Sequence, residues 1–178
     1  MLLLWCLIGY VSVSIILYVL MDLKCKKNPV FKAPSSKVTF YVLAFTWGLP
    51  TVAFGLLVGL ILILCGRRPK RYGWEWCFEF ESIGWGLELG VLFIAPRDPM
   101  GEEDVHMHEH GHGIQNIYLG IFNPLVVFIP SVVRFWYREF RDLIGKPCTT
   151  DYSDIWFEKS ADESGKALIE RLDLEKYS

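Results

Sequence analysis

Two long apolar runs constrain the fold of this 178-residue chain more than any other feature. Residues 1–21 are apolar over about the length that a helix needs to cross the ~30 Å hydrocarbon core of a bilayer. Residues 38–65 form a second run of this kind. Because hydrophobic residues make up 52% of the chain and are concentrated in blocks, an ordinary soluble domain is a poor fit. The sequence predicts an integral membrane protein with two N-terminal transmembrane helices.

The first run is expected to remain in place as an anchor. A cleaved signal peptide is the competing interpretation, but the run lacks a basic start and a small-x-small cleavage site. The lysine-rich segment 22–38 contains two prolines and two serines, which indicates a loop. Pro50 is expected to kink the second helix. Residues 1–71 therefore form a predicted anchor region, followed by a domain over 72–178.

The hydrophobic period changes after residue 71. Residues 74–81 alternate large apolar and polar side chains, which is typical of a half-buried strand. Glycines separate this segment from another apolar run at 87–95, so we predict a β-hairpin over about 74–95. The rest of the domain is expected to be mainly helical, with helices at about 105–119 and 151–174 and an apolar, proline-containing segment at 120–133 between them.

All four histidines of the chain lie between residues 106 and 112, and His108-Glu109-His110-Gly111-His112 matches H-E-x-x-H. Positions i and i+4 of a helix lie on one face, so both His108 and His112 can bind one zinc ion. Glu109 then lies over the zinc-bound water and can act as general base. A surface cluster of histidines is the alternative interpretation of this motif alone.

A catalytic zinc ion requires a third protein ligand and an open position. Glu158 and Asp162, in an E-x-x-A-D element, share one face of the last predicted helix. Glu158 can ligate the metal, and Asp162 can accept a hydrogen bond from a ligand histidine and fix its tautomer. Alone, this element favours a solvated amphipathic helix; together with H-E-x-x-H it favours a metal site. Tyr152 is a candidate donor to the oxyanion.

These paired motifs resemble those of the gluzincin metallopeptidases, whose membrane-embedded branch includes the CAAX-type endopeptidases. The stretch 108–130 also resembles small bacterial membrane proteins with an H-E-x-G-H-x-x-Q core, a pattern that Gln115 and Trp156 fit. The resemblance covers roughly residues 84–165. It implies Zn²⁺ at His108, His112 and Glu158, Glu109 as base, Asp162 behind a ligand, Gln115 as a polar group on the substrate side, and a place in the bacterial cytoplasmic membrane.

Two further histidines depart from the family pattern. His106 and His110 are themselves an i, i+4 pair on the opposite side of the predicted helix, where they can compete as ligands. The register of the metal site depends on which pair binds.

The return path to Glu158 limits the topology. If residues 117–133 crossed the bilayer, the chain would have to recross it within 134–157, a stretch with eight charged residues. Each charge costs ~2.5–3.5 kcal/mol at the bilayer centre. We therefore expect 117–133 to form a re-entrant or interfacial segment that keeps both motifs on one side.

The sequence favours a membrane-bound zinc endopeptidase that acts on a peptide or membrane-protein substrate. A His-rich metal-binding or metal-transport accessory protein is the second hypothesis, because H-x-H-x-H-x-H places four imidazoles on one face of a strand. A structural membrane protein with a decayed site is the third. The near-neutral charge of −2 gives no support to a nucleic-acid partner.

Overall fold

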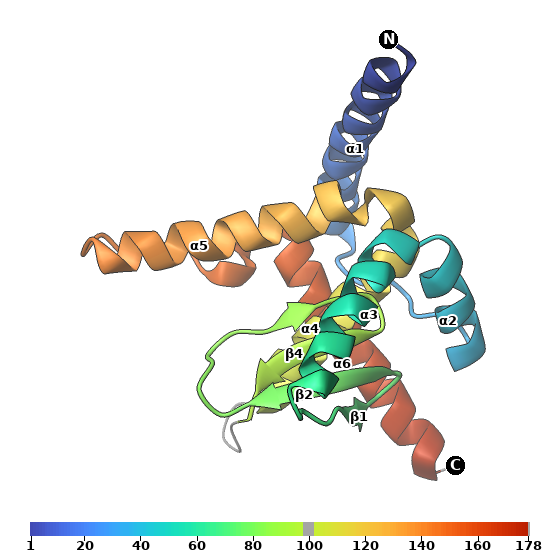
Figure 1. Ribbon diagram of the computed structural model, residues 1–178. Coiled ribbons are helices and arrows are strands. Elements are labelled where there is room, and N and C mark those ends of the chain that lie inside the picture. Colours follow the sequence, from blue (N-terminus) through green and yellow to red (C-terminus); the bar gives the residue numbers. More distant parts are fainter. Residues whose placement is uncertain (98–101, 178) are drawn as a thin grey trace.

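The computed structural model describes residues 1–97 and 102–177, and it is mainly helical with one small sheet (Figure 1). Helix α1 (Leu2–Lys27) projects from the rest of the molecule and is long and apolar enough to cross a membrane. It extends into the lysine-rich segment as far as Lys27, past the predicted end at residue 21, and the loop begins after it. Its last turn carries Lys24, Lys26 and Lys27, and their positive charges stabilise the negative C-terminal end of the helix dipole. The prediction of a long apolar N-terminal helix is confirmed.

The second apolar run, predicted as a helix over 38–65 with a kink at Pro50, forms two separate helices, and the break falls just before Pro50. Helix α2 (Lys37–Thr46) and helix α3 (Leu49–Leu64) meet at an angle of 95°. Pro50 lies in the first turn of α3, where its missing N–H is tolerated, but it cannot continue the hydrogen bonds of α2. A side chain at Gly55 would overlap the carbonyl of Leu89, so α3 lies directly against the sheet segment.

The sheet has four strands in the order β1-β2-β4-β3: β1 (Lys70–Tyr72), β2 (Glu75–Phe80), β3 (Leu87–Glu88) and β4 (Leu92–Pro96). Strands β1 and β2 pair antiparallel, as do β3 and β4, whereas β2 and β4 pair parallel. The two runs expected to form a hairpin over 74–95 therefore pair in parallel, because each makes its tight antiparallel turn with a different short strand.

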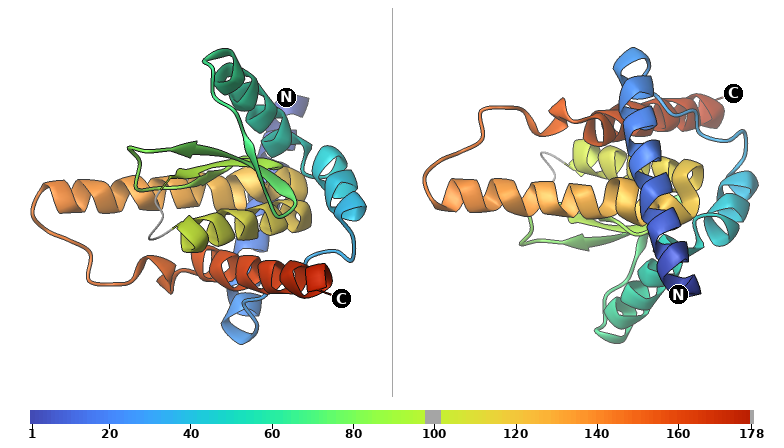
Figure 2. Two further views of the ribbon diagram at one scale, coloured as in Figure 1. Left: turned by 90° about the horizontal axis from the view of Figure 1, so that it is seen from below. Right: turned by 90° about the horizontal axis from the view of Figure 1, so that it is seen from above.

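Helices α4 (Glu102–Leu119) and α6 (Trp156–Tyr177) carry the two predicted motifs and pack closely together. Helix α4 lies between the sheet and α6 (Figure 2). A Cβ at Gly111 would overlap the Ala161 carbonyl, and one at Gly165 would overlap the Met107 carbonyl. Glycine at these two positions lets the helix backbones approach each other, which brings residues 46 positions apart into contact.

The segment after α4 turns sharply. It passes through short helices η1 (Gly120–Phe122) and η2 (Pro124–Phe128) into helix α5 (Ile129–Leu143), and the helices before and after Asn123 differ in direction by 118°. The turn packs on α1, where the Tyr10 hydroxyl donates to the Ile121 carbonyl at 2.7 Å. A final short helix, η3 (Tyr152–Asp154), precedes α6. The chain thus returns to α4 without a straight crossing through 117–133.

Candidate metal centre

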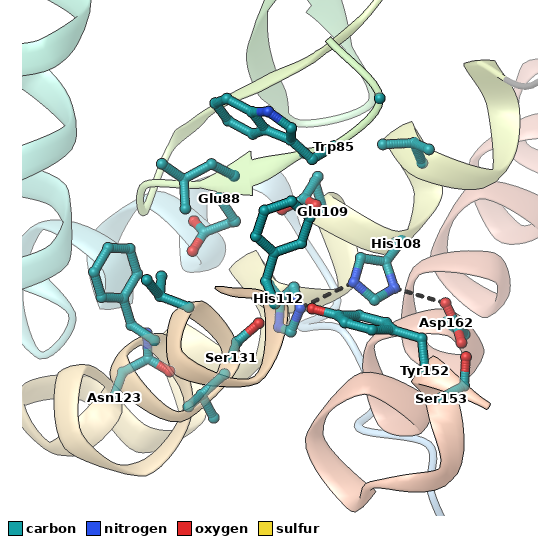
Figure 3. A pocket seen from close by; sticks show the side chains of 18 residues that line it. Trp85, Glu88, His108, Glu109, His112, Asn123, Ser131, Tyr152, Ser153 and Asp162 are labelled. Atoms are coloured by element: carbon teal, nitrogen blue, oxygen red, sulfur yellow. Dashed lines mark hydrogen bonds and ion pairs between the residues drawn. The ribbon is translucent and has the colours of Figure 1, made fainter. Parts of the chain in front are cut away.

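His108 and His112 lie one turn apart on the face of α4 that meets α6 (Figure 3). Their Nε2 atoms are 3.1 Å apart, and the two rings are nearly perpendicular, with centroids separated by 4.7 Å. Both imidazoles therefore present the same nitrogen to one point, as the helical spacing predicts.

Glu158 approaches this point from the first turn of α6 and is fully buried. Its Oε2 lies 3.1 Å from Nε2 of His108 and 3.3 Å from Nε2 of His112. Four donors at Zn–N and Zn–O bond lengths around a tetrahedral zinc ion lie about 3.3 Å from one another. The three side chains are thus a buried group that can hold a metal ion, with nearly the spacing that zinc requires.

Hydrogen bonds behind the group orient each imidazole. Nδ1 of His108 lies 2.6 Å from Oδ1 of Asp162, and Nδ1 of His112 lies 2.8 Å from Oε1 of Gln115. With Nδ1 used in this way, Nε2 of each ring is directed to the centre. Ser131, which the sequence analysis did not identify, donates its hydroxyl to Oε1 of Glu158 at 2.6 Å.

Gln115 occupies a different place from the one expected. It is fully buried, and its Nε2 donates to the Phe157 carbonyl at 2.6 Å and to the Ser160 hydroxyl. Gln115 therefore holds His112 and joins α4 to α6 from behind the centre, rather than facing a substrate.

The charges of the group balance one another. Burial opposes protonation of His108, but its hydrogen bonds to Asp162 and Glu158 raise its pKa to about 10. Burial alone would raise the pKa of Glu158, yet the contacts with His108 and His112 hold it well below its usual range. The buried carboxylate is therefore ionised and is balanced by the protonated imidazole of His108. A divalent metal would take over that role and release the His108 proton.

Glu109 lies beside the group and is buried, at 5% exposed. Burial raises its pKa, while the adjacent His108 and His112 oppose that rise. The chain passes directly over its carboxyl group, because a Cβ at Gly86 would overlap Oε1 of Glu109. The raised pKa makes this carboxylate a stronger proton acceptor than an exposed one.

A cavity of about 380 Å³ opens onto His108, Glu109 and His112 (Figure 3). Tyr152 also lines it, and burial followed by the charge of Glu158 raises the pKa of its hydroxyl, which stays protonated as a donor. Apolar side chains form most of the remaining wall: Trp85, Leu87, Val105, Val127, Phe128, Val132 and Phe135. The cavity thus combines a polar end with an apolar one.

His106 and His110 lie on the opposite face of α4, against strand β2. His110 is fully buried, with Nδ1 3.0 Å from Oε1 of Glu75, and its Nε2 accepts a hydrogen bond from the Trp74 backbone N–H at 3.2 Å. Burial lowers the pKa of His110 to about 3, so the ring is neutral. The second pair therefore faces the sheet and does not compete for the metal group of His108, His112 and Glu158.

Comparison of the chain with protein-family models, with curated proteins and with solved structures gives no match. The fold and the site define the class: a mainly helical protein with an N-terminal helix able to span a membrane and a buried His-His-Glu group able to hold a metal ion. Any function is therefore argued from this group and its surroundings.

Proposed function

We propose that this protein is a membrane-bound zinc endopeptidase that hydrolyses peptide bonds with a metal-activated water. The observation that carries the proposal is the convergence of Nε2 of His108, Nε2 of His112 and Oε2 of Glu158 at 3.1–3.3 Å from one another, with Glu109 beside them. Three protein ligands that open onto a cavity are the arrangement of catalytic zinc sites. Structural zinc sites are instead almost always closed by four protein ligands.

The side chains around the cavity divide the chemistry of hydrolysis among them. Zinc, when bound, would polarise the scissile carbonyl and lower the pKa of water. Glu109 takes a proton from the attacking water and transfers it to the leaving amine as the C–N bond breaks. Tyr152, still protonated, donates a hydrogen bond to the carbonyl oxygen as negative charge develops there.

The sheet supports an extended peptide as substrate. Strand β2 has neighbours on both sides, so it cannot pair with a substrate, whereas β3 is an edge strand and Leu87 and Glu88 line the cavity. An extended peptide pairs readily with an open strand edge. The apolar wall then accepts a hydrophobic side chain next to the scissile bond.

Helices α1 and α5 support attachment to a bilayer. Helix α5 runs across the direction of α1 (Figures 1 and 2), so it lies along the membrane plane if α1 crosses the membrane. Its exposed side carries an apolar and aromatic stripe of the kind found at membrane interfaces: Val133, Trp136, Tyr137 and Phe140. We therefore place α1 across the bilayer, α5 at its surface, and residues 120–128 as the re-entrant turn beside α1.

Replacing Glu109 with Gln tests the proposal. With a mixture of quenched fluorescent peptides in detergent micelles, E109Q should lower the hydrolysis rate by about 10²–10⁴-fold, the contribution of a general base. Zinc content should stay that of the wild type. The matched control is E163Q, which changes an exposed glutamate of α6.

Full hydrolysis by E109Q, or by protein stripped of zinc, would exclude this mechanism. Zinc bound by the wild type without hydrolysis of any peptide would instead favour the accessory metal-binding role.

A further inference from the structure

We propose a second metal site on the opposite face of α4, formed by Cys77, Glu79 and His106. One ligand atom of each lies within 4.8 Å of those of the other two. The site is separate from the cavity and does not depend on the proposed peptidase activity. Its ligand class is a divalent transition metal, and we assign zinc.

The register of strand and helix explains why these side chains meet. Alternate residues of β2 point to one face, so Glu75, Cys77 and Glu79 are on the same side. Two residues along a strand advance about 6.6 Å, and one helical turn advances about 5.4 Å. Every second residue of β2 therefore lies close to successive turns of α4. Glu75 contacts His110 at 3.0 Å, and one repeat further along Cys77 and Glu79 meet His106.

The donor types select the metal. A thiol, an imidazole and a carboxylate are the three side-chain groups that bind zinc in proteins. A thiolate discriminates against Mg²⁺ and Ca²⁺, which prefer oxygen ligands. Cysteine and histidine side chains 29 positions apart are thus placed together in a combination that a soft divalent ion favours.

The surroundings hold the site in a fixed geometry. Cys77 is 1% exposed and His106 is 4% exposed. The rings of Tyr72 and Phe93 pack against the His106 ring, with centroid distances of 5.1 and 5.6 Å. These aromatic walls restrict the orientation of the imidazole and exclude water from the thiol side.

Glu79 contacts two cationic side chains, Lys70 and Arg97, and both contacts use Oε2. We therefore assign Oε1 as the oxygen that would bind the metal. Lys70 and Arg97 already pair with the Glu79 carboxylate, so the Cys77 thiolate is the negative charge left for the metal to neutralise. Partial exposure of Glu79 lets a water complete four-coordination.

Such a site would hold the start of α4 against the sheet. His106 lies two residues before His108, so a metal bound to His106 fixes the position from which the catalytic face of α4 extends. A bound metal of this kind contributes to folding free energy directly, because the unfolded chain has no preformed site.

Cobalt substitution tests the proposal, because, of the two metal-binding groups among the described residues, this one contains a cysteine. The full-length protein in detergent is stripped of metal and titrated with Co²⁺, which replaces zinc and shows a thiolate-to-metal charge-transfer band only when a cysteine is bound. We expect the band in the wild type and in H112A, and its loss in C77S. Metal content should fall from two ions per chain to one in either variant.

A matched control is C25S, which removes another buried cysteine that is not part of a metal-binding group among the described residues. It should keep the band. If C77S does not fold, E79Q changes the least buried of the three ligands and provides the second test. It should weaken Co²⁺ affinity, followed by the charge-transfer band, by at least severalfold. No charge-transfer band in the wild type, or an unchanged band in C77S, would overturn the proposal. Because H112A loses the first metal but keeps the band, failure here is distinguishable from failure of the peptidase assignment.

Discussion

His108 and Asp162 are 54 residues apart in the chain, yet Nδ1 of the imidazole lies 2.6 Å from Oδ1 of the carboxylate. The contact joins α4 to α6 and requires the proton of the His108 ring to be on Nδ1 when a metal is bound at Nε2. The same ring then presents Nε2 to His112 and Glu158 at 3.1 Å each. Asp162 thus orients the His108 ring without itself belonging to the metal-binding group.

Asp162→Asn should lower zinc affinity by about 10–100-fold, the usual effect of losing such a partner of a ligand histidine. An amide can still accept the hydrogen bond, but it does not stabilise the ring with a negative charge. Zinc affinity is measured by competition with a chelator of known strength.

The control for this change is Asp173→Asn, which alters an exposed acid on the same helix and should leave zinc affinity unchanged. Equal affinities in D162N and the wild type would show that Asp162 does not orient His108 in the metal-bound protein.

Tyr152→Phe should reduce kcat by about 10²–10³-fold, the cost of removing one donor to the oxyanion. KM should change little, because the hydrogen bond strengthens only as charge develops on the carbonyl oxygen. Zinc content, measured in the same preparation, should not change. Tyr137→Phe is the control, since that ring is 54% exposed on α5, and a similar fall in both variants would refute the role of Tyr152.

Local spacing was sufficient to predict that His108 and His112 face one point, because an i, i+4 pair on a helix needs no knowledge of the rest of the fold. The convergence of Glu158 and Asp162 on that pair could be predicted only by joining two motifs. The role of Gln115 could not be predicted, since its contacts with His112, Phe157 and Ser160 depend on how closely the two helices pack.

Strand β2 shows why the sheet was harder to predict. Alternation alone suggests that Trp76 and the other aromatic residues face the core and that Glu75 faces solvent. In the structure Trp76 is 44% exposed and Glu75 is fully buried, although Phe78, on the same face as Trp76, is buried as expected. The polar face turns inward because the second histidine pair of α4 supplies partners for it, and pairing of this kind is set by tertiary contacts rather than by local pattern.

Glu88→Gln should stabilise the protein at neutral pH. Burial, and then the charge of Glu75, raise the pKa of Glu88, while the Gly90 N–H opposes the rise. The folded protein therefore keeps a proton that the unfolded chain releases above about pH 4.3. The free energy of unfolding must fall as pH increases from that value towards the raised pKa of the folded state.

The glutamine variant removes this dependence but can still accept the hydrogen bond from Gly90. Chemical unfolding in detergent at about pH 5 and about pH 8 should show a smaller loss of stability for E88Q than for the wild type. Glu81→Gln, at a side chain 73% exposed, serves as the control. Identical pH slopes for E88Q and the wild type would show that Glu88 is not held protonated by the fold.

Gly111→Ala tests whether the approach of α4 to α6 creates the metal group. The new methyl group would overlap the Ala161 carbonyl, so the helices must separate, at a cost of about 1–3 kcal/mol. Alanine also favours the helix by about 1 kcal/mol, so a net loss of stability must come from the crossing itself. Separation moves Glu158 away from the two imidazoles, and zinc affinity should fall together with thermal stability in detergent.

Gly9→Ala, where nothing lies within 4 Å of the added Cβ, should lower neither zinc affinity nor thermal stability. Unchanged zinc affinity in a destabilised G111A would show that the three ligands stay together without close packing of the two helices.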